Sequence, residues 1–219
     1  MSLASDIEAF IDGTGLPDGA RPNLRYASFD YCFNFFQSFH EAGNVAALAA
    51  PEHLQQSCLH LGFYLASWGM YRGSADLLQR SARHLVPTVE AIAGMNPLVW
   101  DIDADCYTES NIEVLGAARE TLGRALGSMS DTLFTKIMLG VFGCVPAFDQ
   151  YFKRGLERWT YGPASLARVG EIYANNKALI DRYRIPTLEF LTGEPTHRRY
   201  TRAKVLDMAF FIKGMRSGQ

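Results

Sequence analysis

The stretch LRYASFDYCFNFFQSFHEA, residues 24–42, decides the fold class of this chain. Apolar side chains recur in it at intervals of three and four residues, the period of one face of an α-helix: Phe29, Cys32, Phe33, Phe36 and Phe39. Seven of the fourteen residues from Tyr26 to Phe39 are aromatic, so the core that this face helps to form is bulky. The stretch therefore predicts a long amphipathic helix.

Helical periodicity continues through most of the chain on both sides of this stretch. Glycine, proline and capping residues divide it into further helices, predicted over residues 6–12, 51–71, 75–94, 110–127, 131–140, 146–159, 164–183 and 201–215. Pro87 should kink the helix over 75–94, and Ser110 should cap the helix after it. Residues 13–23 predict a loop, and no segment alternates like a strand. The sequence thus predicts an all-α fold, a compact globular bundle of about eight or nine helices in a single domain over residues 1–219.

Composition and cysteine spacing limit the class of protein. Of the 219 residues, 48% are apolar and 20% are charged, which is typical of a chain that buries a core. No secretory signal is visible, and no stretch approaches the ~18 apolar residues that cross a membrane. Four widely spaced cysteines are typical of buried free thiols in a reducing compartment: Cys32, Cys58, Cys106 and Cys144. We therefore expect a soluble cytoplasmic protein, with no membrane partner, no metal and no cofactor.

The net charge of −2 hides an uneven distribution along the chain. Residues 1–150 hold 8 basic and 17 acidic side chains, whereas residues 151–219 hold 13 and 6. A basic cluster at the start of the last predicted helix is a candidate nucleic-acid or phosphate site: Arg198, Arg199, Arg202 and Lys204. Because cations there oppose the positive end of the helix dipole, an anionic partner is expected. That partner is either phosphate, from nucleic acid or a nucleotide, or the acidic first part of the same chain.

A glycine-containing turn joins two predicted helices in TKIMLGVFGCVPAFDQYF, residues 135–152. Lys136 precedes the turn, and Asp149 falls in the first turn of the helix that begins at Pro146. Such a hairpin brings the two side chains towards each other, so Lys136 and Asp149 are the candidate catalytic pair. Backbone N–H groups of residues 143–144 are a candidate anion site. The alternative is a structural ion pair that holds the hairpin together.

A candidate pocket lies at the end of the helix predicted over residues 51–71. Trp68, Tyr71 and Arg72 combine two large aromatic rings with a cation. The alternative is core packing, with an arginine where the helix dipole favours it. Residues 101–112 begin like a calcium loop but lack its turn glycine and its final glutamate. The motifs of the easily recognised hydrolases, NTPases, dehydrogenases and zincins do not occur.

Two segments resemble known families. TKIMLGVFGCVPAFDQYF and YLASWGMYRG, residues 135–152 and 64–73, resemble an uncharacterised bacterial all-helical family, which implies a bacterial origin and a helical fold but no activity. The first segment is also similar, more weakly, to helix-hairpin-helix DNA glycosylases, which pair a glycine-rich hairpin with a lysine and an aspartate: here Lys136, Gly140, Gly143, Pro146 and Asp149. It departs from those enzymes in the spacing of its glycines, in a lysine that precedes them, and in an aspartate that follows too soon.

Three classes of function remain open. The first is a binding or interaction module without chemistry, which would suit a homo-oligomer. The second is a nucleic-acid-associated protein that uses the hairpin and the basic C-terminal part, with a glycosylase-like activity as its catalytic form. The third is an enzyme with a pocket near Lys136, Asp149 and Arg72.

Overall fold

The predicted amphipathic helix forms as α2 (Ala27–Glu41). The computed structural model describes residues 2–12, 21–73, 76–127, 129–157 and 159–217. Four of the five apolar residues on the predicted face of α2 are buried, and the fifth, Phe39, is partly buried. The ring of Phe29 stacks on Phe33 and meets Tyr64 and Tyr200 edge-on. These aromatic contacts join α2 to segments that are distant in the sequence.

The all-α prediction is confirmed. The described residues form ten α-helices: α1 (Leu3–Asp12), α2, α3 (Pro51–Ser67), α4 (Val86–Ala93), α5 (Glu109–Leu126), α6 (Asp131–Phe142), α7 (Gln150–Gly155), α8 (Pro163–Asn175), α9 (Lys177–Arg182) and α10 (Arg202–Arg216). Short 3₁₀ turns lie between them: η1 (Arg21–Asn23), η2 (Val45–Ala49), η3 (Asp76–Gln79), η4 (Ala82–Leu85) and η5 (Pro97–Asp101). The count exceeds the predicted eight or nine partly because the segment over 164–183 divides into α8 and α9 at Asn176.

Several predicted boundaries shift. The segment expected as one kinked helix over 75–94 forms η3, η4 and α4 instead, and Pro87 lies in the first turn of α4, where a missing N–H is tolerated. The helix expected from Pro146 begins at Gln150, with Asp149 as its N-cap. Residues 74–75, and residues 13–20 of the predicted loop, lie outside the described part of the chain.

A β-hairpin that the sequence did not predict joins α9 to α10. Strands β1 (Pro186–Leu188) and β2 (Pro195–Arg199) pair antiparallel, with Pro186 opposite Arg199. The hairpin is held on α2, because Asp30 accepts a hydrogen bond from Leu188 N and Asn34 donates one to Leu188 O. The two strands are short, begin with proline and are largely polar, so the sequence shows no alternation of apolar residues there. The hairpin is recognised only from its contacts with α2.

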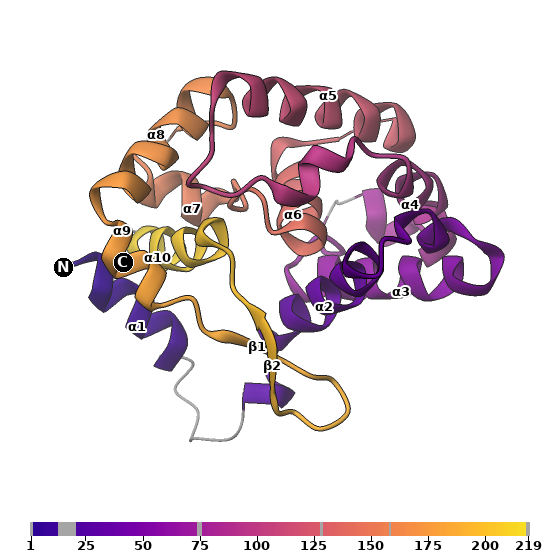
Figure 1. Ribbon diagram of the computed structural model, residues 1–219, viewed down its shortest axis with the longest axis horizontal. Coiled ribbons are helices and arrows are strands. Elements are labelled where there is room, and N and C mark those ends of the chain that lie inside the picture. Colours follow the sequence, from indigo (N-terminus) through magenta and orange to yellow (C-terminus); the bar gives the residue numbers. More distant parts are fainter. Residues whose placement is uncertain (1, 13–20, 74–75, 128, 158, 218–219) are drawn as a thin grey trace.

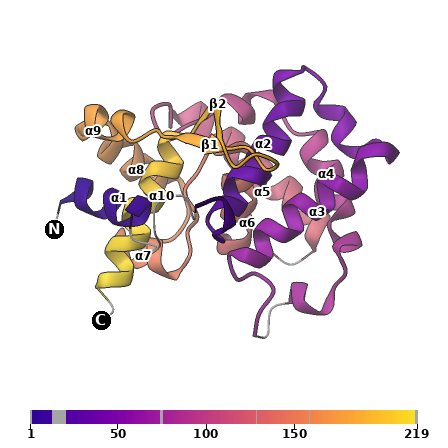
Figure 2. The ribbon, with the colours of Figure 1, turned by 90° about the horizontal axis from the view of Figure 1, so that it is seen from below.

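Helix α6 lies at the centre of the molecule. Figures 1 and 2 show α2, α3 and α4 on one side of it, and α1 and α7–α10 on the other. All its residues from Leu133 to Phe142 are buried. Because α6 is enclosed all round, its one basic side chain, Lys136, is carried into the interior.

The four cysteines are free thiols, and all but Cys106 are buried, as their spacing predicts. None of the described helices is long and apolar enough to span a bilayer.

The N-cap of α5 gives a test of the corrected boundary. Thr108, not Ser110, occupies the N-cap position, and its side chain accepts a hydrogen bond from Asn111 N. We expect Thr108→Ala to lower the free energy of unfolding by about 1 kcal/mol. Ser110→Ala, which removes the predicted cap, should change it by less than about 0.5 kcal/mol. Urea unfolding of both variants checks the assignment, and the reverse order of effects would contradict it.

Candidate functional site

Lys136 and Asp149 lie together in the interior, as the hairpin arrangement predicts. Lys136 is 4% exposed, and its Nζ lies 3.5 Å from Asp149 Oδ2. The same Nζ donates a hydrogen bond to Trp68 O at 3.0 Å. The other oxygen of Asp149 accepts from Tyr151 N and Phe152 N and so caps α7. The cap holds the carboxylate in one orientation, with Oδ2 directed at the lysine.

A second lysine–aspartate pair lies beside the first. In α10, Lys204 Nζ lies 3.2 Å from Asp207 Oδ2, and both side chains are buried. Asp207 Oδ1 accepts a hydrogen bond from Ala147 N at 3.0 Å, which ties α10 to the turn between α6 and α7. Lys204, expected at a phosphate-binding surface, is therefore interior.

The two pairs share a small cavity. Its volume is about 10 Å³, the space of about one water molecule. Three helices, α3, α6 and α10, and the turn before α7 contribute its lining: Tyr64, Trp68, Lys136, Leu139, Ala147, Asp149, Lys204, Asp207 and Phe211. Four candidate residues that the sequence placed in three separate sites thus meet at one point: Lys136, Asp149, Trp68 and Lys204.

The indole of Trp68 is part of the cavity wall and is itself partly exposed. Lys136 Nζ and Lys204 Nζ lie 5.4 Å and 5.1 Å from its ring centre, within cation–π range. Arg25, which is exposed, lies 5.7 Å from the same ring. Trp68 Nε1 is buried, and no described residue accepts a hydrogen bond from it. A buried donor without a partner is rare in folded proteins and marks the site as unusual.

Burial shifts the pKa of one residue in each pair towards its neutral form. Burial lowers the pKa of Lys136, and the nearby Asp149 carboxylate partly opposes this effect. Burial raises the pKa of Asp207, and the ammonium of Lys204 partly opposes it. Lys136 therefore releases its proton more readily than a surface lysine, and the neutral form of a lysine amine is the one that acts as a nucleophile.

The other two residues of the predicted pocket do not line the cavity. Arg72 is exposed and folds back over Gly69, whose φ of +79° turns the chain after α3. Tyr71 is partly buried against the core, and burial raises the pKa of its phenol. Of the predicted trio, only Trp68 belongs to the site.

Arg198 and Arg202 of the basic cluster meet carboxylates of the same chain. Arg198 forms two hydrogen bonds to Glu41. Arg202 lies within 3.4 Å of three aspartates: Asp103, Asp105 and Asp181. Arg199 is exposed and donates to Arg184 O. These contacts favour the interpretation that the acidic first part of the chain is the anionic partner, and a phosphate contact by these residues stays a prediction.

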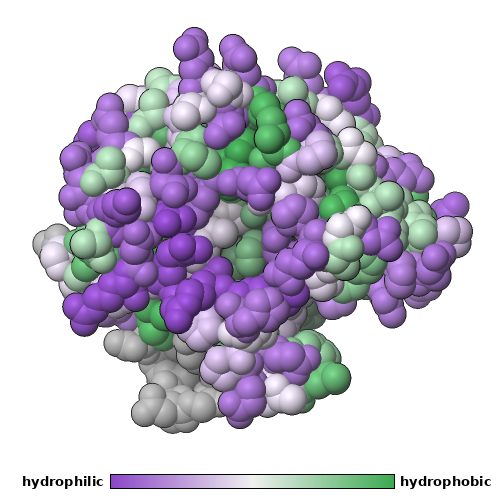
Figure 3. Space-filling view, in the orientation of Figure 1, coloured by the Kyte–Doolittle hydropathy of each residue, from purple (hydrophilic) through white to green (hydrophobic). Residues whose placement is uncertain are grey.

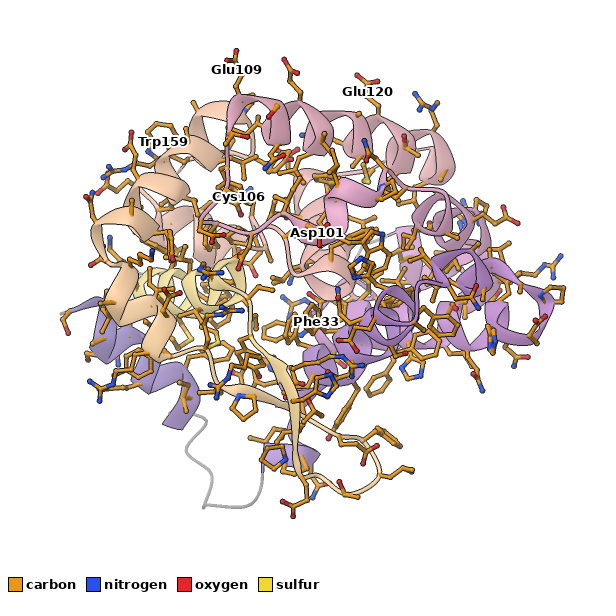
Figure 4. All side chains as sticks on the ribbon, viewed as in Figure 1. Phe33, Asp101, Cys106, Glu109, Glu120 and Trp159 are labelled. Atoms are coloured by element: carbon orange, nitrogen blue, oxygen red, sulfur yellow. The ribbon has the colours of Figure 1, made fainter. Side chains whose placement is uncertain are left out.

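Asp103 provides the anion expected at the N-terminus of α10. Its two oxygens accept hydrogen bonds from Arg202 N and Ala203 N, each at 2.8 Å. It lies on the connection between Asp101 and Cys106, which crosses the face seen in Figure 4. Carboxylate contacts with the first backbone N–H groups of a helix are favourable, so the chain itself neutralises this helix end.

The anion site predicted at residues 143–144 is corrected by the structure. Gly143 N donates to Leu139 O, because Gly143 closes α6 in the left-handed conformation. Asp149 occupies the first N–H groups of α7. The N–H of Gly143 is therefore taken up within the protein.

Sequence reasoning missed Asp207 and Tyr64. Asp207 is the one charged residue in VLDMAFFI, residues 205–212, and a lone acid in an apolar run was the available signal. Tyr64 carries no such signal, because an aromatic residue on a helix is most often part of the core.

Comparison with family models, curated proteins and solved structures finds no match to this chain. The resemblances to a bacterial helical family and to helix-hairpin-helix glycosylases therefore stay predictions. The interpretation of the site rests on its own geometry.

Proposed function

We propose that this protein is an enzyme that uses the amine of Lys136 as a nucleophile, with Asp149 as the group that holds it and exchanges its proton. The observation that carries the proposal is the convergence of two lysine–aspartate pairs, buried except for the partly buried Asp149, on one cavity lined by a tryptophan whose N–H has no acceptor among the described residues. Perturbed ionisable groups in such clusters are characteristic of functional sites.

The reaction that suits this arrangement is imine formation with the carbonyl carbon of an aldehyde or ketone. Asp149 takes a proton from the Lys136 ammonium, and the resulting amine attacks the carbonyl carbon. A C–N bond forms and the C–O bond breaks: the carbonyl oxygen takes one proton from the attacking nitrogen and the one that Asp149 returns, and leaves as water. The product is an iminium ion, whose positive charge is again paired with the Asp149 carboxylate. The second pair, Lys204 and Asp207, adds one positive and one negative charge beside the first, so its net charge on the site is zero.

Access to Lys136 requires Trp68 to move. The cavity holds about one water molecule, so a substrate reaches the amine only when the indole swings outwards. Trp68 is the C-cap residue of α3, and Gly69 follows it with φ of +79°. The wall of the site is thus built from the end of a helix, where few backbone hydrogen bonds oppose displacement.

A glycosylase-like activity on nucleic acid is the second candidate. It is favoured by one observation: a glycine-containing turn between two helices brings a lysine and an aspartate together, with Lys136 Nζ 3.5 Å from Asp149 Oδ2. The same amine would then attack the sugar carbon of a nucleotide, displace the base with a proton, and form the same kind of imine after ring opening. The two candidates share a nucleophile and differ in substrate.

Reductive trapping tests the nucleophile. The protein is incubated with borohydride and either propanal or duplex DNA that carries an abasic site, and the modified lysine is identified by mass spectrometry. We expect the adduct on Lys136, its loss in Lys136→Arg, and trapping slowed about a hundredfold in Asp149→Asn, because proton transfer then fails. The probe that reacts distinguishes the carbonyl enzyme from the glycosylase.

The matched control is Lys177→Arg, which replaces an exposed lysine of α9. It should leave the yield of the adduct unchanged. Circular dichroism and the melting temperature show whether Lys136→Arg is folded. Adducts spread over the exposed lysines, with Lys136 unmodified in the folded protein, would overturn the proposal and favour a module without chemistry.

A further inference from the structure

A groove on the surface lies between α2, α3 and the loop that joins β1 to β2. Its volume is about 460 Å³, within the range of small-molecule sites. The floor comes from α2 and the segment before it, at Leu24, Arg25 and Ser28. The walls come from α3 and the β1–β2 loop, at Leu59, Phe63 and Phe190.

Large apolar side chains are exposed on both walls. Phe63 and Phe190 are each 68% exposed, and Leu59 is 49% exposed. Figure 3 shows apolar colour gathered over the β1–β2 loop, at the lower right of the view. Phe190 is held in place by an edge-on contact with the ring of Tyr31, at 5.0 Å between centroids. Exposed apolar rings that line a groove are typical of a ligand site.

The charge of the groove has one sign. Arg25 is the charged residue among those that line it, and no described lining residue is acidic. Its contacts are with aromatic side chains, since Nη2 donates to Tyr26 Oη at 3.3 Å and the guanidinium lies 5.0 Å from the same ring. Its charge therefore has no carboxylate partner in the part of the chain that the structure describes.

His60, also in the lining, adds no charge. Its ring stacks on Phe35 at 4.1 Å between centroids, and burial lowers the pKa of its imidazole. The neutral ring extends the apolar wall and leaves Arg25 as the one cation. A ligand that complements this groove has an apolar body and a single negative charge.

We propose that the groove binds a small amphiphilic monoanion, with its apolar body between Phe63 and Phe190 and its carboxylate on Arg25. This site is separate from the Lys136 cavity and does not depend on its chemistry. Both sites adjoin the same wall, because Arg25 lies 5.7 Å from the Trp68 ring.

Three ligands with the same chain test the proposal: decanoate, decan-1-ol and decyltrimethylammonium. Isothermal calorimetry measures their dissociation constants. We expect decanoate to bind about tenfold more tightly than decan-1-ol, the size of one charge-assisted interaction, and the ammonium to bind most weakly. Arg25→Gln should abolish the preference for decanoate over decan-1-ol and leave the binding of decan-1-ol unchanged.

Phe63→Ser should weaken decanoate and decan-1-ol alike, by about tenfold. Its matched control is Leu98→Ser, which removes another exposed apolar side chain outside the groove. Melting temperatures close to that of the unaltered protein show that the variants are folded, which their exposure favours.

Four results would overturn the proposal. The first is the absence of saturable decanoate binding below about 1 mM, and the second is binding of decyltrimethylammonium as tight as that of decanoate. The third is decanoate binding that Phe63→Ser leaves unchanged. The fourth is a protein that does not bind decanoate but forms a dimer that Phe63→Ser dissociates. The last result would assign the groove to a second copy of the chain. Reductive trapping at Lys136 is measured separately, so failure here is distinguishable from failure of the proposed activity.

Discussion

Replacement of Gly214 by alanine is expected to lower the free energy of unfolding by about 3 kcal/mol or more. Gly214 of α10 faces α7, and a Cβ at this position would overlap the carbonyl oxygen of Tyr151 and lie 2.8 Å from Gly155 N. The obstacle is backbone, which cannot rotate away as a side chain does. The two helices must therefore move apart, and the buried contacts between them loosen. Thermal and urea unfolding measure the effect.

Gly116→Ala is the matched control. Gly116 lies in the exposed part of α5, and nothing stands within 4 Å of a Cβ added there. The same substitution should then stabilise the protein by about 0.5–1 kcal/mol, because alanine loses less backbone entropy in a helix. At the same crossing, a Cβ at Gly155 would overlap Phe210 O. The double variant Gly155→Ala, Gly214→Ala should therefore lose less stability than the sum of the two single variants. A Gly214→Ala variant as stable as the unaltered protein would contradict the close crossing of α7 and α10.

Replacement of Asp207 by alanine is expected to lower the free energy of unfolding by about 3–5 kcal/mol. The substitution leaves the Lys204 ammonium buried without its carboxylate, at a site where it is 2% exposed. It also removes the acceptor for Ala147 N, so a buried backbone N–H loses its partner. Urea unfolding measures the loss.

The double variant Lys204→Met, Asp207→Leu separates pairing from packing. Because apolar residues of similar volume often replace a buried ion pair without loss, it should recover most of the stability that Asp207→Ala loses. An exposed pair of the same spacing, Arg168 and Glu171 on α8, provides the control, since Glu171→Ala should change stability by less than about 1 kcal/mol. Equal effects at the two pairs would show that Asp207 is not buried with Lys204.

The relation of Lys136 to Asp149 was accessible from the sequence because it is local. The two residues flank one turn, and the glycines and Pro146 mark where the chain reverses. The amphipathic face of α2 was likewise readable, since it depends on residues within a few helical turns.

The position of Lys204 was not accessible in this way. In the sequence it completes a basic cluster, yet in the structure it lies over the rings of Phe10, Phe29 and Trp68. Those rings belong to three other helices or their ends, brought there by the packing of α10. Arg198 shows the same limit, because its partner Glu41 is 157 residues away.

The amino-acid sequence alone determined the helical class, most of the helices and the lysine–aspartate hairpin, because helix periods, caps and turns are short-range properties. Only the tertiary structure decided that Trp68, Lys136, Lys204 and Asp207 share one cavity and that Arg198 and Arg202 meet carboxylates. It also decided that a polar segment pairs as a hairpin. Burial and charge pairing depend on which helices pack together, and that choice is made by contacts between residues that are far apart in the chain.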